Sequence, residues 1–210
     1  MSFADIRRDY SGEPLSETES DPDPFRQFER WFGQARNLET DPTACALATA
    51  SADGRPSARM VLLKGVDSGF VFFTNYNSRK AQELAQTGRA CLLFYWGSVV
   101  RQVRIEGTVA KVSDAESDAY FSTRPRESRW SVYASDQSSA IENRLALESR
   151  YELARTTYGE TIPRPHWWGG YRLFPDEFEF WQGRPSRLHD RIRYVRDGDG
   201  HGWKRERLAP

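Results

Sequence analysis

Short β-rich segments, separated by glycine-containing turns, follow one another along most of this 210-residue chain. ACALATAS, ARMVLLKGV and FVFFTN are joined by ADGR and DSG, and RACLLFYW, VVRQVRIEGTVAKV, EFEFWQ and RLHDRIRYV follow later. Apolar runs bounded by such turns are typical of strands in hairpin order. Helical segments are inserted among the strands rather than alternating with them, which disfavours a parallel sheet. We expect a mainly β fold with inserted helices (α+β), built on an antiparallel sheet or barrel.

The inserted helices have recognisable starts and stops. Asp23 and Pro24 are a typical helix N-cap and first residue, and Gly88 ends the helical segment SRKAQELAQ. Ser113 and Glu116 have the spacing of a capping box, and a longer helix is expected over about 139–158. The polar, proline-containing residues 1–24 are predicted to form a mobile arm on a single domain of residues 25–210.

Composition excludes several classes of protein. The 30 basic and 30 acidic residues balance, so a broad electrostatic surface for nucleic acid or an anionic membrane is not indicated. No run approaches the roughly 18 apolar residues of a membrane span. The cysteines, Cys45 and Cys91, lie in apolar runs and are expected to be buried free thiols, which suits a reducing cytoplasm.

Basic residues are instead gathered in local groups. NYNSRKAQEL places Arg79 and Lys80 in the first turn of a helix, where the backbone N–H groups already favour an anion, so a bound phosphate would relieve the repulsion. YFSTRPRES offers a tyrosine, an arginine and a serine for a second phosphate, although the same residues could merely cap a helix. A solvated surface is the alternative interpretation of any single group.

A third basic group surrounds a histidine in RLHDRIRYV. If this segment is an extended strand, Arg187, His189, Arg191 and Arg193 share one face, because side chains alternate along a strand. An anionic ligand and a neutral histidine would then resolve the repulsion. Metal sites, a serine-hydrolase elbow and glycine-rich nucleotide loops have no recognisable motif here, so the organic chemistry is expected to belong to a bound cofactor.

Taken together, these motifs resemble one known family. RMVLLK, FFTNYNSRKAQEL, RQVRIEG, YFSTRPRES, SDQSSAI, WGGYR, FWQGRPSRLHDR and the terminal RLAP are similar to pyridoxine (pyridoxamine) 5′-phosphate oxidases, in the order in which that family has them. The resemblance covers about residue 7 to the C-terminus. It implies an FMN-binding split β-barrel that works as a homodimer, with FMN at the subunit interface. It also implies oxidation of pyridoxine or pyridoxamine 5′-phosphate to pyridoxal 5′-phosphate, with O₂ as acceptor and H₂O₂ as product.

The resemblance also implies site residues. Those expected to contact FMN are Arg59, Met60, Val61, Leu62, Leu63, Lys64, Phe73, Thr74, Arg79, Lys80, Gln102, Gln137, Ser138, Trp181 and Arg191. Those expected to contact substrate are Arg7, Arg8, Asp9, Tyr10, Lys64, Tyr120, Arg124, Ser128, Arg187, Leu188 and His189, with Arg187 and His189 as the catalytic pair. Arg59 and Lys64 are an odd number of residues apart, so a bulge or strand end must intervene if both serve one site.

One segment departs from the family. Where relatives commonly have Ile-Gly-Ala-Trp, this chain has Trp130, Ser131, Val132 and Tyr133, and these larger side chains could reshape the substrate pocket or the dimer contacts. Three alternatives remain open: a related flavin oxidase with another substrate, such as a phenazine precursor, a non-catalytic flavin or pyridoxal-phosphate carrier, and a single-strand nucleic-acid binder.

Overall fold

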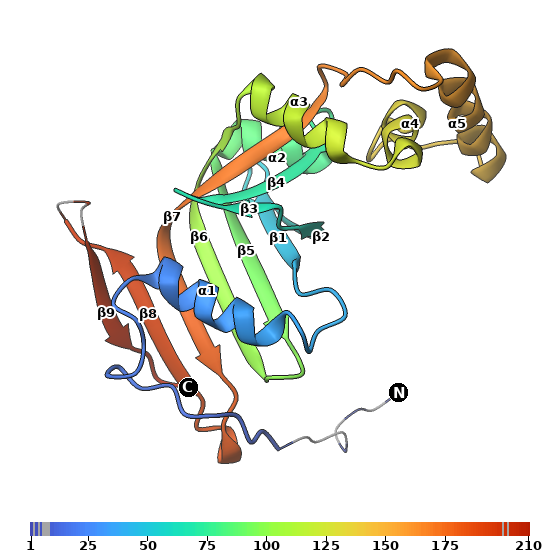
Figure 1. Cartoon of the computed structure of the whole chain (residues 1–210). Helices are drawn as coiled ribbons and strands as arrows, with labels where there is room; N and C mark the ends of the chain where they lie inside the picture. Colours follow the sequence, from blue (N-terminus) through green and yellow to red (C-terminus); the bar gives the residue numbers. More distant parts are fainter. Residues whose placement is uncertain (2, 4, 6–8, 199, 201) are drawn as a thin grey trace. The chain divides into compact units, whose positions relative to one another are not determined.

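The computed structural model (Figure 1) describes residues 1, 3, 5, 9–198, 200 and 202–210. The chain divides into two compact units. The first consists of Met1–Ala48, Cys91–Gly107 and Pro175–Pro210, and the second of Thr49–Ala90 and Thr108–Phe174. Each unit is therefore assembled from stretches that are far apart in the sequence.

The first unit is built on antiparallel strands. Their order is β1 (Ala44–Ala50), β5 (Arg89–Trp96), β6 (Arg101–Lys111), β7 (Trp168–Gln182), β8 (Asp190–Arg196) and β9 (Trp203–Arg207), of which β1, β5, β6 and β7 also have residues in the second unit. The register pairs Ala46 with Leu93, and Phe180 with Ile192. The antiparallel pairing of these strands confirms the arrangement expected from the sequence, although β1 and β5 are neighbours that are not consecutive in the chain.

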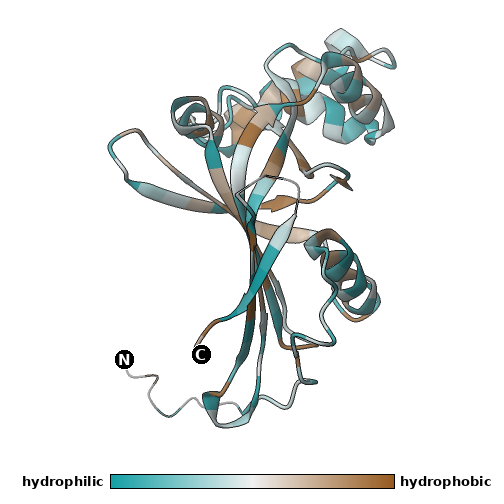
Figure 2. Cartoon of the chain, turned by 90° about the vertical axis from the view of Figure 1, so that its left-hand side faces the viewer, coloured by the Kyte–Doolittle hydropathy of each residue, from teal (hydrophilic) through white to brown (hydrophobic). Residues whose placement is uncertain are grey.

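Helix α1 (Pro24–Ala35) packs its apolar side against the strands of this unit. Its start is as expected, because the Asp23 carboxylate accepts the Phe25 N–H at 2.9 Å. The rings of Phe28 and Phe94 lie 5.2 Å apart, and those of Trp31 and Phe180 lie 5.3 Å apart. The other side of the helix is hydrophilic, so both colours appear along it in Figure 2. Because of this amphipathic pattern, α1 packs with its apolar side against the strands.

The segment before α1 packs on β8 and β9. Leu15 is buried, and its N–H donates to the Asp190 carboxylate at 3.1 Å. The Tyr194 hydroxyl donates to the Asp21 carbonyl at 2.7 Å, and Arg205 donates to the Ser20 carbonyl at 2.6 Å. That residues 1–24 form a mobile arm stays a prediction.

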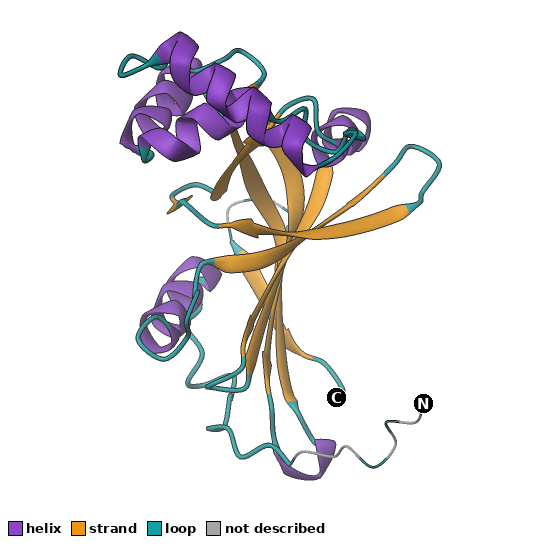
Figure 3. Ribbon diagram, turned by 90° about the vertical axis from the view of Figure 1, so that its right-hand side faces the viewer, coloured by secondary structure: helices purple, strands orange, loops and turns teal. Residues whose placement is uncertain are grey.

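The second unit combines strands with inserted helices. Its strands β2 (Pro56–Leu62), β3 (Gly65–Val66) and β4 (Phe70–Asn75) come first, and β4 pairs antiparallel with β3 and with the first part of β7. The helices are α2 (Arg79–Thr87), α3 (Asp114–Thr123), α4 (Arg126–Ala134) and α5 (Arg144–Tyr158). Figure 3 shows α4 and α5 side by side, and the Trp130 and Tyr151 rings meet between them at 6.2 Å.

Two glycines of β7 allow close packing in the second unit, whose core contains buried residues such as Phe70 and Leu173. A Cβ on Gly169 would lie 2.2 Å from the Tyr76 hydroxyl, and one on Gly170 would lie 2.7 Å from a Val112 methyl group. Both contacts are too close for any larger residue. The WGGY motif therefore reflects close packing against β7.

Most of the expected helix boundaries are confirmed. Gly88 ends α2 with φ 65°, and the Ser113 hydroxyl accepts the Glu116 N–H at the start of α3. The helix expected from about residue 139 begins only at Arg144, because the Asn143 side chain caps it there. Helix α4 was not expected. Within the described ranges, no helix is both long and apolar enough to cross a membrane.

Candidate functional site

A cavity of about 920 Å³ lies within the second unit. Strands β2, β4 and β7 and helices α3, α4 and α5 contribute to its wall. Its lining consists of Leu62, Lys64, Phe73, Thr74, Asn75, Tyr120, Arg124, Ser131, Val132, Ala134, Ser135, Gln137, Arg144, Leu147, Glu148, Tyr151, Glu152 and Trp168. The volume is in the range of small-molecule and cofactor sites.

Arg124 gives this cavity a cation with unused hydrogen-bonding capacity. Its guanidinium carbon lies 4.7 Å from the centre of the Trp168 ring, and its Nη1 is buried without a hydrogen-bond partner among the described residues. Burial lowers the pKa of Arg124, and the adjacent Tyr120 hydroxyl opposes that shift. An unpartnered guanidinium nitrogen is costly to bury, so this position suits an anionic ligand.

Aromatic rings support Arg124 from the same side. The Tyr120 ring stacks on Phe73 with 3.9 Å between centroids, and Phe73 stacks on Trp168 at 5.6 Å. Burial raises the pKa of Tyr120, with nearby Arg124 acting in the opposite direction, so its hydroxyl stays protonated at neutral pH. It is therefore available as a hydrogen-bond donor.

Lys80 forms a second basic position beside the cavity. Its ammonium group donates to Thr74 Oγ1 at 3.1 Å, Ser78 Oγ at 3.3 Å and Gln137 Oε1 at 2.9 Å. Lys80 is 7 % exposed and has no carboxylate within ion-pair distance in the described part of the chain. Burial, and then the charge of Arg59, lower its pKa to about 8.

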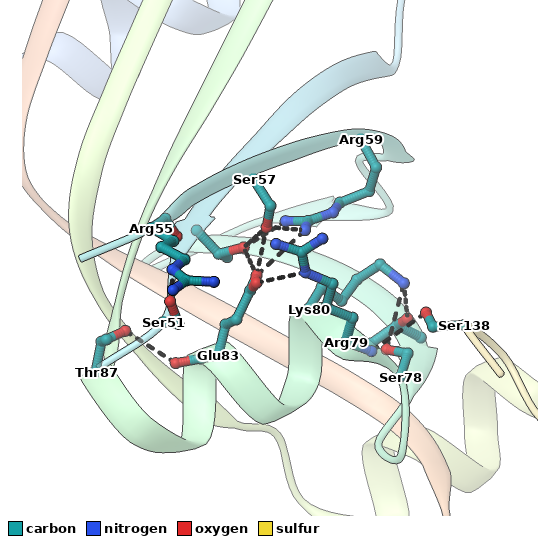
Figure 4. Close-up of polar contacts among 12 residues, drawn as sticks. Ser51, Arg55, Ser57, Arg59, Ser78, Arg79, Lys80, Glu83, Thr87 and Ser138 are labelled. Carbon is teal, nitrogen blue, oxygen red and sulfur yellow. Dashed lines mark hydrogen bonds and ion pairs between the residues drawn. The ribbon is translucent and has the colours of Figure 1, made fainter. Parts of the chain in front are cut away.

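Arg59 and Arg79 meet a buried carboxylate at the start of α2 (Figure 4). Arg59 Nη2 lies 3.2 Å from Glu83 Oε2, and Arg79 Nε lies 2.8 Å from Glu83 Oε1. The Arg79 backbone N–H donates to Ser138 Oγ at 3.2 Å. Ser138 itself has a positive φ of 78°. Arg79 and Lys80 thus stand in the first turn of α2, as the sequence predicted, and Glu83 brings Arg59 close to Arg79.

The structure therefore gathers one large set of predicted residues in the second unit. Leu62, Lys64, Phe73, Thr74, Tyr120, Arg124 and Gln137 line the cavity, while Arg59, Arg79, Lys80 and Ser138 lie around the start of α2. Strand β2 ends at Leu62, before Lys64, which confirms the strand end that the odd spacing required. Of the others, Met60 is exposed, Val61 is half-buried, Leu63 is buried, and Ser128 lies half-buried in α4. None of these four lines the cavity.

A second set of predicted residues lies in the first unit. The His189 ring centroid lies 4.7 Å from that of Trp181 and 5.6 Å from that of Tyr10. The backbone N–H of Arg184 donates to His189 Nδ1 at 3.1 Å, which assigns the proton of the neutral imidazole to Nε2. This unit also contains Asp9, Gln102, Arg187, Leu188 and Arg191. Arg7 and Arg8 lie outside the described residues.

The prediction of an extended strand around His189 is wrong. Pro185–Arg187 is a short 3₁₀ turn, and β8 begins only at Asp190. Ser186 and Arg187 have φ values of 56° and 61°, so the backbone reverses here instead of alternating. Arg187 and Leu188 are both exposed. A proline-initiated turn overrides the extended pattern that the spacing suggested.

The repulsion expected between Arg191 and Arg193 is resolved by protein carboxylates. Arg191 Nε lies 2.7 Å from Glu179 Oε1 on the neighbouring strand, and Arg193 lies 3.0 Å from Glu177 and 3.2 Å from Glu206. These acids face the arginines across the β7–β8 and β8–β9 pairs. No external anion is required for this part of the basic group.

The segment that departs from the family holds α4 in place. Trp130 Nε1 donates to the Gly159 carbonyl at 3.1 Å, and the Tyr133 hydroxyl donates to the Pro163 carbonyl at 2.8 Å. Ser131 and Val132 line the cavity, whereas Trp130 and Tyr133 do not. The two large side chains therefore tie α4 to the chain after α5, and only the smaller ones border the ligand space.

Sequence reasoning missed the acids that organise the basic residues. Glu83 has the i,i+4 spacing from Arg79 that would have indicated a pair on one helix. Glu179 gives no local signal, because its partners come from other strands. No cluster of metal-ligating side chains occurs among the described residues.

Two family models match the chain. Residues 32–158 match the model described as pyridoxamine 5′-phosphate oxidase, and residues 168–210 match the pyridoxine 5′-phosphate oxidase C-terminal dimerisation region. A pyridoxine/pyridoxamine 5′-phosphate oxidase of Paraburkholderia phymatum is 59 % identical over 100 % of this chain and 99 % of its own. One from Janthinobacterium sp. (strain Marseille) is 55 % identical over the full length of both.

Solved structures support the same relationship. PhzG from Burkholderia lata, in complex with tetrahydrophenazine-1-carboxylic acid, is 35 % identical with a TM-score of 0.88 and covers 95 % of this chain and 100 % of its own. A pyridoxamine 5′-phosphate oxidase-related, FMN-binding protein of Nostoc punctiforme has a TM-score of 0.72 at 18 % identity, over 90 % of this chain and 100 % of its own. These likenesses confirm the split-barrel fold expected from the sequence. The chain therefore belongs to the pyridoxamine 5′-phosphate oxidase family.

Proposed function

We propose that this protein is an FMN-dependent oxidase that converts pyridoxine 5′-phosphate or pyridoxamine 5′-phosphate to pyridoxal 5′-phosphate, with O₂ as acceptor and H₂O₂ as product. Full-length relatives at 59 % and 55 % identity carry the name of this activity. The observation that carries the proposal is the unpartnered Nη1 of Arg124 in a cavity that also borders the Lys80 group. Two separate cationic positions suit two phosphates, one on the cofactor and one on the substrate.

The residues at the start of α2 suit the flavin phosphate. Arg79 and Lys80 stand in the first helical turn, where backbone N–H groups and the helix dipole already attract an anion. Lys80 has only uncharged partners, so a phosphate would supply the negative charge that its surroundings lack. When bound, FMN would supply the two-electron redox chemistry of the reaction. We propose that Phe73, Thr74 and Gln137 complete the cofactor contacts.

We propose that the substrate phosphate binds at the other cationic position, around Arg124. Arg124 would donate from Nη1, Tyr120 from its hydroxyl, and Lys64 from its ammonium group. Ser128 lies in α4, four residues after Arg124, and is proposed to complete this set. Clamping the phosphate fixes the pyridine ring, and such positioning lowers the barrier by removing translational and rotational freedom.

His189 and Arg187 are proposed to contact the pyridine ring. Because Nδ1 accepts the Arg184 N–H, the His189 Nε2 proton is the one available to donate to the substrate. The edge-on contact with Tyr10 and the tilted contact with Trp181 fix the plane of the imidazole. Arg187 has a positive φ, a strained conformation of the kind that is retained at functional sites. The substrate contacts of Asp9, Tyr10 and Leu188, and the FMN contacts of Gln102, Trp181 and Arg191, remain part of this proposal.

The assembly is proposed to be a homodimer with FMN at the interface. Residues 168–210 match a region that is described as a dimerisation region.

The free thiols Cys45 and Cys91 suit a reducing compartment, and we propose that the protein is located in the cytoplasm.

The direct test is an absorbance spectrum of the purified protein, followed by addition of pyridoxine 5′-phosphate under air. We expect a flavin spectrum and accumulation of pyridoxal 5′-phosphate. Flavin without product would favour a non-catalytic carrier, and a chain that takes up no added FMN would overturn the proposal.

Substituting Arg124 separates the two phosphate sites. Arg124→Ala should raise the KM for the phosphorylated substrate about 10- to 100-fold, the size of a lost charge-assisted hydrogen bond, and leave the Kd for FMN within about twofold. Arg126→Ala is the matched control, because Arg126, at the start of α4, is exposed, pairs with Glu160 and does not line the cavity. Equal losses of substrate and FMN affinity would contradict this division of roles.

A phenazine-type oxidase is the second candidate. The solved neighbour PhzG holds a tetrahydrophenazine carboxylic acid, and a carboxylate could also pair with Arg124. The higher identity to the pyridoxine/pyridoxamine 5′-phosphate oxidases favours a phosphate. Turnover of a reduced phenazine carboxylic acid at a higher kcat/KM than pyridoxine 5′-phosphate would reverse this preference.

A further inference from the structure

Glu83 lies in α2 and pairs with both Arg59 and Arg79. Its side chain is 5 % exposed, yet it lies beside the exposed guanidinium of Arg79 and the half-buried guanidinium of Arg59 (Figure 4). A buried carboxylate is strongly unfavourable unless donors surround it. The donors around Glu83 must therefore offset the cost of burying its charge.

The carboxylate of Glu83 is fully enclosed by donors. Its Oε2 accepts from the hydroxyls of Ser57 and Thr49, each at 2.5 Å, and from Arg59 at 3.2 Å. Its Oε1 accepts from Arg79 Nε at 2.8 Å. Burial alone would raise the pKa of Glu83, but these hydrogen bonds outweigh burial and lower it to about 2. Glu83 is therefore ionised throughout the physiological pH range.

Glu83 also determines how each arginine is oriented. Arg59 is held a second time, by hydrogen bonds to Thr49 and Ser57, so its guanidinium is fixed on both edges. Arg79 uses only Nε for Glu83, and its two terminal nitrogens make no hydrogen bond within the described residues. The side chain of Arg79 is 60 % exposed, so its free edge is accessible to solvent, and Arg79 is the first residue of α2.

We infer that Glu83 is a positioning residue for the cofactor phosphate: it holds Arg59 and Arg79 side by side and leaves the free edge of Arg79 ready to bind the phosphate. This inference rests on the proposed FMN function. Glu83 does not touch the phosphate itself and acts through the two arginines. Without its negative charge, two guanidinium groups and the nearby Lys80 would repel one another, and the arginine side chains would lose their fixed orientation.

A competing effect predicts the opposite result. Glu83 is an anion near the site proposed for another anion, so its removal would strengthen FMN binding if simple Coulomb repulsion dominated. The geometry favours positioning, because the arginines stand between Glu83 and solvent and the local charge of Arg59, Arg79, Lys80 and Glu83 is positive. The sign of the change in FMN affinity therefore distinguishes the two effects.

Comparison of FMN with riboflavin isolates the phosphate. The full-length chain is freed of flavin, and the Kd for each is measured by quenching of flavin fluorescence. Riboflavin lacks only the phosphate, so it reports on the rest of the site and on folding. In Glu83→Gln we expect FMN affinity to fall about tenfold or more, as for other residues that orient a primary ligand, with riboflavin affinity within about twofold.

Three further variants make the test specific. Glu83→Asp retains the charge at a shorter reach and should lose less FMN affinity than Glu83→Gln, which also covers the case in which Glu83→Gln fails to fold. Asp118→Asn is the matched control, because Asp118 pairs with the buried Arg164 in the same unit. In an Arg79→Met background, Glu83→Gln should have a much smaller effect on FMN binding, because the residue through which it acts is gone.

The outcomes separate this inference from the proposed function. If the unmodified chain binds no FMN, the proposed function fails. If it binds FMN but Glu83→Gln binds FMN equally well or more tightly, only the positioning role is overturned. Equal losses of FMN and riboflavin affinity would assign Glu83 a purely structural role and would also overturn the inference.

Discussion

Lys80 is a buried cation whose hydrogen-bond partners are all uncharged. Burial and the neighbouring Arg59 lower its pKa from 10.5 to about 8, so without a ligand it changes charge just above neutral pH. A bound phosphate favours the protonated form. The affinity of this position for an anion is therefore predicted to depend on pH in a range where free phosphates and arginines do not titrate.

We predict that FMN binds more weakly as the pH rises through about 8, because neutral Lys80 no longer attracts the phosphate. The Kd should increase by at most about tenfold per pH unit between pH 8 and 9.5. The measurement is a fluorescence titration at constant ionic strength, with Lys80→Met as the control that should abolish the dependence. An equally steep dependence in Lys80→Met would contradict the assignment.

The same pKa has an opposite effect on folding without ligand. The folded-state pKa of about 8 lies below the ordinary 10.5, so the unfolded chain binds more protons between these values. The contribution of Lys80 to the free energy of unfolding should therefore increase as the pH rises through this window. Urea unfolding of flavin-free wild type and Lys80→Met at pH 7.5 and 9.5 measures it. A difference between the two proteins that does not change with pH would contradict the predicted shift.

At the scale of single residues, the sequence predicted where the cations lie better than what they contact. Arg79, Lys80 and Arg124 were recognised because local spacing places them near a helix start or a proline turn. Glu83 and Glu179 were missed because a buried carboxylate gives no signal in sequence until its partners from other elements are known. Arg187 was assigned to a strand, and a turn with two positive φ values replaced it.

At the scale of elements, α4 depends on contacts outside the cavity that it borders. The Tyr133 hydroxyl donates to the Pro163 carbonyl at 2.8 Å, and the Tyr133 ring lies 4.1 Å from that of Tyr158. Ser131 and Val132 of the same helix line the cavity. Loosening the tether should therefore affect substrate binding through the position of α4.

We predict that Tyr133→Phe lowers the free energy of unfolding by about 1 kcal/mol, the usual contribution of one hydrogen bond. It should raise the KM for pyridoxine 5′-phosphate about two- to fivefold. The free energy that corresponds to this factor does not exceed the stabilisation lost with the hydrogen bond. Urea unfolding and initial rates measure the two effects. Tyr95→Phe is the control, since Tyr95 is 52 % exposed on β5. A changed stability without any change in KM would show that α4 does not need this tether to shape the cavity.

Strands and most helix boundaries followed from local patterns, because turn glycines, Asp23 and Ser113 act over a few residues. Helix α4 did not, because its short sequence RESRWSVYA directly follows Pro125, where a turn was expected. Its position depends on Trp130 and Tyr133 reaching Gly159 and Pro163, about 30 residues later. Long-range contacts of this kind are not visible in a local pattern.

At the scale of the whole molecule, the two units are interleaved along the chain. No linker-like composition separates them, so the sequence could not divide residues 25–210 further. Within the first unit, Cys45 is buried and Cys91 half-buried, and both are free thiols as expected. Burial raises the pKa of Cys45 to about 12, with nearby Cys91 adding to the shift, and burial also raises that of Cys91.

Thiol reactivity should therefore report on global folding. At pH 8 the folded protein should react with iodoacetamide at least about 100-fold more slowly than the urea-unfolded chain, because the reactive thiolate is scarce and enclosed. Mass spectrometry of the alkylated chain at timed intervals measures this. Rapid modification of Cys45 in the folded protein would show that this part of the sheet opens easily.

The enclosed carboxylate of Glu83 means that Arg59 and Arg79 already have a negatively charged partner before any cofactor binds. We expect a newly synthesised chain to complete this part of its structure without waiting for FMN. The vitamin supply of the cell would then set how much of the protein is active rather than how much accumulates. A cell short of riboflavin would hold a reserve of finished but inactive chains, which returning cofactor converts to enzyme without new protein synthesis.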